Sequence, residues 1–262
     1  MRVALITITG CGLAVGNRVI DAFGDAVMDL FLPKKFEGQS TAANIYTESL
    51  SALTSRIFNK YDGIVYIMAM GIVLRVIAPN IKDKYSDPAV VVIDDVGRYV
   101  ISALSGHEGG ANRLSLKIAG ILHTDAVITT GSESVKDVII GIGCKRGVLA
   151  DDIKLAIEKS LRDVNIPIDR VRLLSTIDLK ANEPGLVSAS QELDIPLRIV
   201  SREEIASCLI EYKESEFVKK SIGVGAVCEP AAILGGRKTK LILTKQKFAG
   251  ITIAIAVENF TW

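Results

Sequence analysis

The stretch MRVALITITGCGLAVGNRVIDAF, residues 1–23, decides the fold class. Its aliphatic and β-branched residues predict a strand over residues 2–9, glycines mark a turn, and apolar residues at helical spacing predict a helix over residues 14–23. The stretch VIIGIGCKRG, residues 138–147, repeats the strand and the glycine turn. Strands that alternate with helices are typical of parallel βαβ units. We therefore expect an α/β protein of two lobes, each a mostly parallel sheet flanked by helices.

The rest of the chain continues this alternation. Further strands are expected at residues 26–32, 63–67, 89–94, 99–104, 126–129, 172–176 and 197–200. Further helices are expected at residues 43–58, 71–77, 110–122, 183–193, 202–210 and 230–234, the last with Pro230 at its first position, and Asp151 or Asp152 is expected to cap a helix that ends at Asp163. Asp94-Asp95-Val96-Gly97 predicts a turn between antiparallel strands. Residues 239–258 predict a C-terminal β-hairpin connected at residues 245–248.

The domain boundary is expected in the polar stretch GSESVKD, residues 131–137. A chain of 262 residues is long enough for two domains with cores of their own. We place an N-terminal domain at residues 1–135 and a C-terminal domain at residues 136–262. A ligand is expected in the cleft between the two lobes, near the strand ends.

Composition excludes several classes of protein. A hydrophobic content of 49% and a net charge of +1 exclude disorder, and neither this charge nor the 5% aromatic content suits a nucleic-acid partner. The mean hydropathy is +0.35, but the longest apolar run, residues 62–75, is shorter than the roughly 20 residues of a spanning helix. The first residues show no signal-peptide cleavage site. We expect a cytoplasmic protein with no membrane partner.

The four cysteines lack CxxC spacing, and the chain has only two histidines. Neither a disulfide framework nor a zinc site is therefore expected, and the thiols are expected to be reduced.

The stretch SGHEGGAN, residues 105–112, is the strongest candidate for catalysis. His107 titrates near neutrality, and Glu108 beside it can orient it or accept a proton itself. The amides of Gly109 and Gly110, at a helix start, suit a developing negative charge. These groups fit the addition of water to an ester or lactone. A plain strand-to-helix turn is the open alternative, and so is a nucleophilic Ser105 with His107 as its base, although two residues so close on a turn need not face each other.

The glycine turns are candidate anion sites, because each directs backbone N–H groups and a helix N-terminus at whatever lies above the strand. In the second turn Cys144 is followed by two cations, Lys145 and Arg146, which suit an anionic ligand or are solvated surface charges. Glu229 lies at another helix start, where an acid also stabilises the helix dipole.

The first turn also resembles a dinucleotide fingerprint, with glycines at positions 10, 12 and 16 and Asp29 as a ribose-binding acid. The alternative is that these glycines only form the turn that follows a strand.

Several strings together resemble a known family. Residues 62–119 and VITTGSES (127–134) resemble the N-terminal region of the cobalt-precorrin-5A hydrolase family, also called cobalamin biosynthesis protein G (CbiG). GIGCKRG (141–147), STIDLKANEPGL (175–186) and VCEPAAIL (227–234) resemble its C-terminal domain in the expected order. The middle segment of that family is missing between TTGSES and GIGCKRG, so the chain resembles a short form.

The resemblance implies a step of anaerobic cobalamin (vitamin B12) biosynthesis. The family opens the δ-lactone between the ring A acetate and the meso carbon, and releases that carbon with its methyl group as acetaldehyde. We expect the cobalt-corrinoid substrate to bring the cobalt, with no cofactor or metal site in the protein. A homodimer and transient contacts with neighbouring pathway enzymes are further expectations.

The implied substrate assigns roles to the candidate residues. His107, Glu108, Gly109 and Gly110 are expected to be catalytic, with Asn112 as a further donor. The carboxylates of the macrocycle are expected to bind at Gly10, Gly12, Arg75, Lys82, Lys84, Arg98, Gly143, Cys144, Lys145, Arg146 and Glu229. A non-catalytic tetrapyrrole-binding or carrier protein and a nucleotide-dependent oxidoreductase remain the alternatives.

Overall fold

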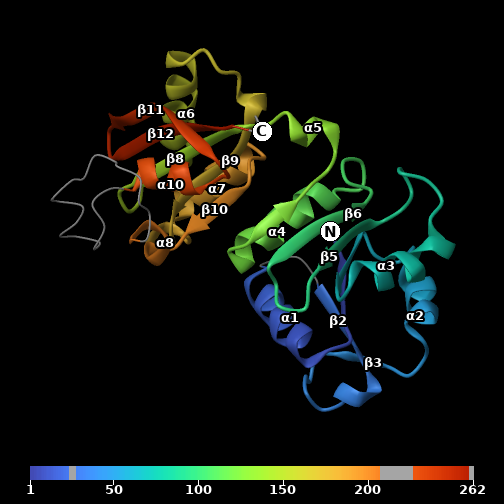
Figure 1. Ribbon diagram of the computed structural model, residues 1–262. Helices are drawn as coiled ribbons and strands as arrows, with labels where there is room; N and C mark the ends of the chain where they lie inside the picture. Colours follow the sequence, from blue (N-terminus) through green and yellow to red (C-terminus); the bar gives the residue numbers. More distant parts are fainter. Residues whose placement is uncertain (24–27, 207–226, 260–262) are drawn as a thin grey trace. The chain divides into compact units, whose positions relative to one another are not determined.

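The computed structural model describes residues 1–23, 28–206 and 227–259 (Figure 1). The chain divides into two compact units, Met1–Thr130 and Gly131–Trp262. The division thus falls at the start of the polar stretch 131–137, slightly before the boundary proposed from the sequence.

The first unit is built on a seven-stranded sheet of order β3-β2-β1-β4-β5-β6-β7. All neighbouring strands are parallel except β5 and β6, which form an antiparallel pair. The strands are β1 (Val3–Thr7), β2 (Met28–Pro33), β3 (Asn44–Tyr46), β4 (Gly63–Ile67), β5 (Ala89–Ile93), β6 (Tyr99–Leu104) and β7 (Asp125–Val127).

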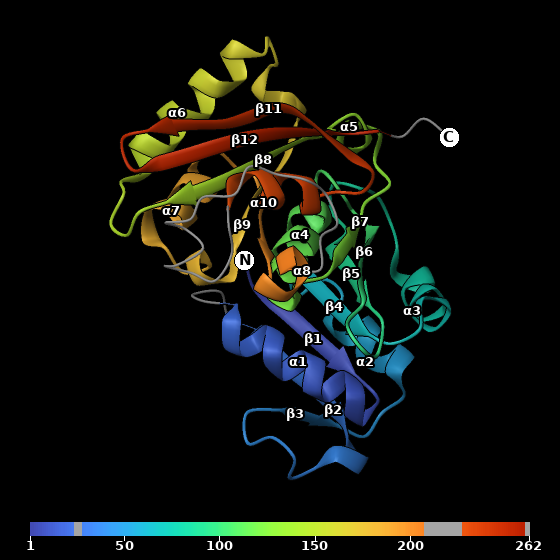
Figure 2. The same ribbon diagram turned by 60° about the vertical axis from the view of Figure 1, so that its left-hand side comes forward.

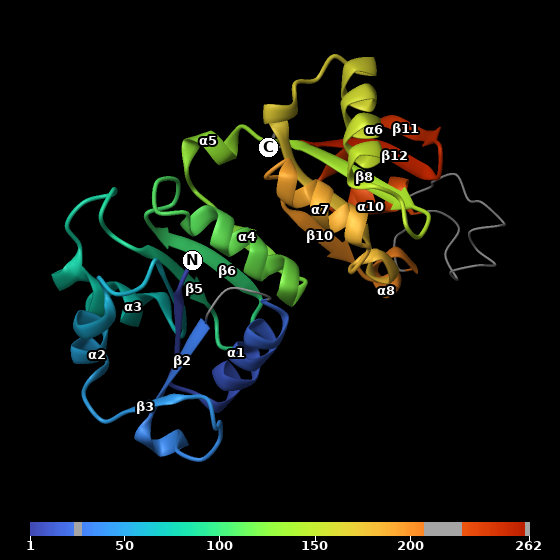
Figure 3. The same cartoon turned by 180° about the vertical axis from the view of Figure 1, so that it is seen from behind.

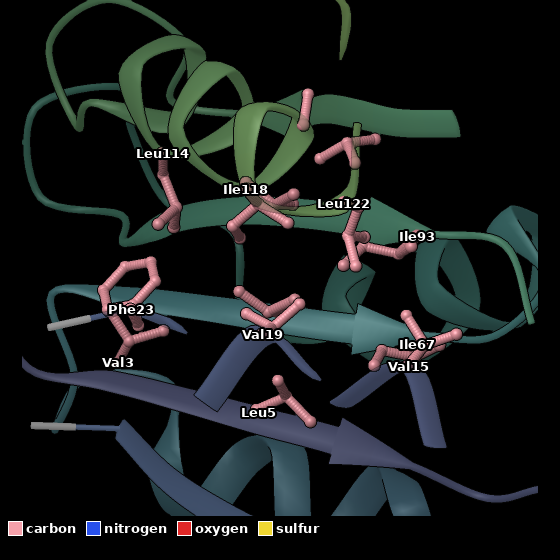
Figure 4. Close-up of a cluster of buried hydrophobic side chains, with 14 of the residues drawn as sticks. Val3, Leu5, Val15, Val19, Phe23, Ile67, Ile93, Leu114, Ile118 and Leu122 are labelled. Atoms are coloured by element: carbon pink, nitrogen blue, oxygen red, sulfur yellow. The ribbon is translucent and has the colours of Figure 1, made fainter. Parts of the chain in front are cut away.

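Helices cover both faces of this sheet, because its strands are apolar on both sides. One face packs against α1 (Gly10–Ala22) and α4 (Ala111–Leu122), and Figure 4 shows Val19 and Ile118 meeting the strands there. The other face packs against α2 (Leu50–Ile57) and α3 (Met70–Ile77). Figure 3 shows α1 and α4 together on one side of the sheet. Continuous apolar strands are the pattern expected of a doubly covered sheet.

The hairpin between β5 and β6 decides where the later loops lie. Its turn contains Gly97 with a φ of +73°, and it pairs Ile93 with Val100 and Val90 with Leu104. Strand β6 therefore runs against β1, β4 and β5, and β7 runs parallel to β6. As a result, the carboxyl ends of β6 and β7 lie at the edge of the sheet where the other strands begin.

The second unit contains a five-stranded mixed sheet of order β10-β9-β8-β12-β11. The pairs among β8, β9 and β10 are parallel, whereas β12 runs antiparallel to both β8 and β11. Figure 2 shows β8, β12 and β11 side by side. The strands are β8 (Val138–Cys144), β9 (Val171–Ile177), β10 (Leu197–Val200), β11 (Thr239–Phe248) and β12 (Ile251–Glu258). The predicted α/β class and C-terminal hairpin are confirmed; each sheet is mixed, the first mostly parallel and the second with two parallel and two antiparallel pairs.

Alternate residues of β8 face different helices. Val138, Ile140 and Ile142 pack with the apolar side chains of α6 (Ala150–Asp163) and α7 (Pro184–Glu192). Gly141 faces the other way, against α10 (Cys228–Leu234), where an added Cβ would lie 1.9 Å from the carbonyl oxygen of Cys228. This glycine lets the helix backbone approach the strand closely. The other α-helices in the described part of this unit are α5 (Gly131–Ser134) and α8 (Arg202–Ala206).

Two predicted helices begin elsewhere in the structure. Helix α1 begins at Gly10 because Thr9 caps it, the Thr9 hydroxyl accepting a hydrogen bond from Gly12 N at 3.0 Å. The predicted glycine turn is therefore the first turn of a helix. Helix α10 begins at Cys228, so Pro230 is its third residue, still within the first turn, where no intrahelical N–H bond is lost.

Other boundaries also differ. The helix predicted over residues 43–58 is replaced by strand β3 and helix α2, whose cap Ser49 accepts a hydrogen bond from Ala52 N. Leu149, not Asp151 or Asp152, is the N-cap residue of α6. The C-terminal hairpin turns at residues 249–250, where Gly250 has a φ of +82°, and not at residues 245–248. Of the helix predicted over residues 202–210, the last four lie outside the described residues.

No helix in the described part of the chain is long and apolar enough to cross a membrane.

Candidate functional site

The SGHEGG loop, residues 105–110, connects β6 to α4 at the edge where the parallel strands of the first unit begin. Its ends are closed by two backbone hydrogen bonds, from Ala111 N to the Ser105 carbonyl at 3.2 Å and from Asn112 N to the Gly106 carbonyl at 2.9 Å. Gly110 has a φ of +84° and turns the chain into the helix. The loop is thereby held against the first turn of α4.

Asn112 fastens this loop to two neighbouring segments. Its buried side chain accepts a hydrogen bond from Ser102 Oγ and donates one to Thr130 Oγ1, each at 2.8 Å. Because the amide oxygen and one N–H of the amide nitrogen are engaged, Asn112 positions the loop, and its second N–H is the donor that the sequence interpretation assigns to the substrate. Thr130 belongs to the TTGSES string, which gave the only sequence hint of its role.

Glu108 forms an ion pair with Lys84, with 3.0 Å between Oε1 and Nζ. The hydrogen bond from Lys84 holds the pKa of Glu108 below its usual value, and the same bond raises the pKa of Lys84. A lowered pKa makes Glu108 a weaker base than the sequence suggested. The pair joins the SGHEGG loop to the segment that precedes β5.

That segment, residues 82–87, is organised by Asp87, which the sequence interpretation missed. Asp87 is buried, and both of its carboxylate oxygens accept from Lys82 N, at 3.1 and 3.0 Å. The side chains of Lys82 and Lys84 are exposed, and Lys84 contacts the loop through Glu108. An Asp five residues after a lysine carries no distinctive pattern, so only the fold shows this contact.

His107 and two amides remain available for a ligand. The His107 side chain is exposed, and neither it nor the backbone N–H of Gly109 or Gly110 has a hydrogen-bond partner among the described residues. A titratable ring thus lies in the same short loop as two free donors at the start of a helix of 12 residues. This combination can activate water and stabilise an oxyanion.

Of the other residues predicted in the first unit, Gly10, Gly12 and Arg98 lie at the opposite edge of the sheet. Gly10 and Gly12 form the start of α1 after the carboxyl end of β1, and Arg98 follows the β5–β6 turn at that same edge. Gly12 N already donates to Thr9, whose hydroxyl in turn donates to Asp95 at 2.8 Å. The exposed Arg75 lies in α3, with Nη1 bonded to the Gly71 carbonyl.

The structure does not support Asp29 as the ribose-binding acid of a dinucleotide site. Asp29 is the second residue of β2, at the beginning of the strand, and it is bound by Arg2 and Tyr61 at 2.7 Å each. A ribose-binding acid would have to lie at the carboxyl end of that strand. The prediction of Asp29 as a ribose-binding acid, which needs it near the end of that strand, was therefore wrong.

In the second unit, a carboxylate of the protein itself binds the predicted glycine turn. Gly147 N donates to Glu183 at 2.7 Å, and Lys180 forms an ion pair with the same carboxylate at 2.9 Å. Gly143 lies within β8, and Cys144 ends that strand with its thiol pKa raised by burial. The amide of Gly147 is thus occupied.

The predicted charged residues of this unit differ in exposure. Lys145 and Arg146 have exposed side chains, as an anion site requires. Glu229 is only 1% exposed and accepts from Lys245 N at 2.9 Å, so it connects α10 to β11. Among the residues the structure describes, no group of three or more His, Cys, Asp and Glu side chains is arranged to hold a metal ion.

Comparison with known proteins identifies both halves of the chain. The family model for the cobalamin synthesis G N-terminal region matches residues 52–133, and the model for the cobalamin synthesis G C-terminus matches residues 138–256. The cobalt-precorrin-5A hydrolase of Priestia megaterium is 28% identical, and the match covers 97% of this chain and 94% of the relative. The probable cobalt-precorrin-5A hydrolase of Methanocaldococcus jannaschii is 30% identical, and the match covers 75% of this chain and 86% of the relative.

A third relative matches a shorter part. Protein CobE of a Sinorhizobium species is 32% identical over 45% of this chain and 78% of its own length. The match to the Priestia megaterium protein extends over 355 positions, so that relative contains residues without a counterpart among the 262 of this chain. The chain therefore belongs to the cobalamin synthesis G family, as its sequence strings predicted.

Proposed function

We propose that this chain is a cobalt-precorrin-5A hydrolase. It opens the ring A δ-lactone and releases the meso carbon with its methyl group as acetaldehyde, giving cobalt-precorrin-5B. Family membership and the names of the two hydrolase relatives support this reaction. The observation that carries it is the exposed His107 in one loop with the free amides of Gly109 and Gly110.

His107 accepts a proton from water as the water oxygen attacks the lactone carbonyl carbon. The amides of Gly109 and Gly110 donate to the carbonyl oxygen as it becomes negative. The bond from the acyl carbon to the ring oxygen then breaks, which leaves an acetate side chain and a hydroxyl on the meso carbon. Cleavage between that carbon and the macrocycle turns the hydroxyl oxygen into the carbonyl oxygen of acetaldehyde, and a proton returns to the macrocycle.

Glu108 and Lys84 serve this site as a pair. Their contact holds the SGHEGG loop to residues 82–87, and it places positive charge beside the loop. Lys84, and Lys82 two residues before it, are candidate contacts for carboxylates of the macrocycle at the site. Lys145 and Arg146 are candidate anion contacts of the second unit taken by itself, and the cobalt enters as part of the substrate.

Substitution of His107 tests this assignment. We expect His107→Ala to lower kcat about 100-fold or more, the usual range for loss of an acid–base group. Binding, followed by the visible spectrum of the corrinoid, should change only a few fold. The matched control is His123→Asn at the end of α4, where φ is +55° and Asn is tolerated. Unchanged turnover in His107→Ala would remove the histidine from the mechanism.

A non-catalytic tetrapyrrole-binding protein is the second candidate, because the Priestia megaterium relative contains residues that this chain lacks. Anaerobic incubation separates the two: a binding protein changes the visible spectrum of the corrinoid but returns it with unchanged mass. Titration with NAD(P)H, followed by fluorescence, tests the oxidoreductase alternative, for which we expect no saturable binding.

A further inference from the structure

Ser105, the first residue of the SGHEGG loop, has an unusual backbone conformation. Its φ is +54°, in the left-handed region that non-glycine residues rarely adopt. His123, Asn165 and Asp194 share this conformation just after a helix, where it is common, and Lys238 shares it immediately before β11. Ser105 instead follows strand β6. Such strained residues cluster at functional sites.

The hydroxyl of Ser105 is also left without a partner. The residue is 7% exposed, and its Oγ has no hydrogen-bond partner among the described residues. Among the described residues, only Ser115 and Ser175 also have a buried hydroxyl without a hydrogen-bond partner. Ser115 lies within α4 and Ser175 within β9, so neither belongs to the SGHEGG loop. A buried, unsatisfied donor is costly unless a ligand uses it.

Gly109 covers this side chain. A Cβ added at Gly109 would lie 2.5 Å from Ser105 Cβ and 3.0 Å from the Ser105 carbonyl oxygen. The bare Cα of the glycine therefore fits directly over Ser105, next to the free amides of Gly109 and Gly110. The hydroxyl and the two amides are therefore donors of one short loop that no described residue uses.

We propose that Ser105 is a substrate-contacting residue, whose hydroxyl donates a third hydrogen bond to the acyl oxygen held by the Gly109 and Gly110 amides. This inference rests on the proposed function. It assigns no covalent role to Ser105, because a nucleophile needs a base within reach, and no hydrogen bond joins Ser105 Oγ to His107 among the described residues.

Substitution by alanine separates this role from a structural one. Removing one oxyanion donor typically costs about 100- to 1000-fold in kcat, and we expect about 10- to 100-fold for Ser105→Ala with little change in KM. The melting temperature should stay the same or rise, because the hydroxyl has no protein partner to lose. Ser105→Gly should show the same loss of kcat, since it relaxes the backbone but also lacks the hydroxyl.

Ser115→Ala is the matched control, since it removes another unpartnered hydroxyl and should leave kcat unchanged. Wild-type kcat in Ser105→Ala would overturn the proposal. If the wild type itself forms no product, the proposed function fails, and the contact is then judged by the Kd for cobalt-precorrin-5A. About fivefold weaker binding in Ser105→Ala, with no change in Ser115→Ala, would support the contact. An equal Kd in the two variants would overturn it.

Discussion

The Asn112 side chain offers a direct test of how the SGHEGG loop is held. Asn112→Ala removes two side-chain hydrogen bonds, to Ser102 Oγ and Thr130 Oγ1, each 2.8 Å long. Each such bond contributes about 0.5 to 1.5 kcal/mol. We therefore expect the free energy of opening around this loop to fall by about 2 kcal/mol, which is about a 30-fold increase in the opening equilibrium constant.

Amide hydrogen exchange of the full chain measures this change locally. Peptides from residues 99–130 should exchange about 30-fold faster in Asn112→Ala. Peptides from the second unit provide the internal reference and should not change, because Asn112 and both of its side-chain partners lie in the first unit. Equal exchange in the variant and the wild type, or faster exchange throughout both units, would refute the positioning role.

Single substitutions of the partners refine the magnitude. Ser102→Ala and Thr130→Val each remove one of the two bonds. Each should therefore produce about half of the loss, on the order of 1 kcal/mol or roughly a fivefold change in exchange. If one of them reproduced the whole effect of Asn112→Ala, the other bond would contribute nothing.

Two further predictions concern the second unit and the thiols. Lys180 and Gly147 lower the pKa of Glu183 in the folded state, so its contribution to stability is present above the unfolded pKa of about 4.3 and is lost as the pH falls through the folded value. Glu183→Gln should thus cost about 1 to 2 kcal/mol at pH 7 but little at pH 3, as measured by urea unfolding. With iodoacetamide at pH 8, exposed Cys11 should react before Cys144, and Cys228 last, because burial raises its pKa to about 11. Peptide mass spectrometry would contradict this order if Cys228 reacted as fast as Cys11.

Strands were easier to predict from the sequence than the segments between them. The ranges 63–67 and 99–104 agree with β4 and β6, because unbroken aliphatic runs between turn residues leave little choice of length. The helix predicted over residues 43–58 failed because its first residues pair with β2, a contact distant in sequence. The start of α1 was misplaced because glycines were weighed above the Thr9 cap.

The sequence indicated which loop forms the site, but not which contacts hold that loop in place. The stretch 105–112 has the chemistry in its residue types, and the structure adds the contacts that organise it, from Lys84, Thr130 and Ser102. These partners are 10 to 24 residues away in sequence, so no local spacing indicates them. A sequence signal did exist for the placement of Gly10 and Gly12 at the edge of the sheet opposite the SGHEGG loop. The predicted 94–97 hairpin reverses β6, which moves the loop after it to the other edge of the sheet.

The most direct test of the proposed function is anaerobic incubation of the purified protein with enzymatically prepared cobalt-precorrin-5A. Acetaldehyde is followed with a coupled alcohol dehydrogenase, and the corrinoid by mass spectrometry. We expect acetaldehyde and lactone-opened product in equal amounts, with oxygen from labelled water in the new carboxylate of the macrocycle. A corrinoid that binds, as seen in its visible spectrum, but returns with unchanged mass and no acetaldehyde would contradict the hydrolase assignment.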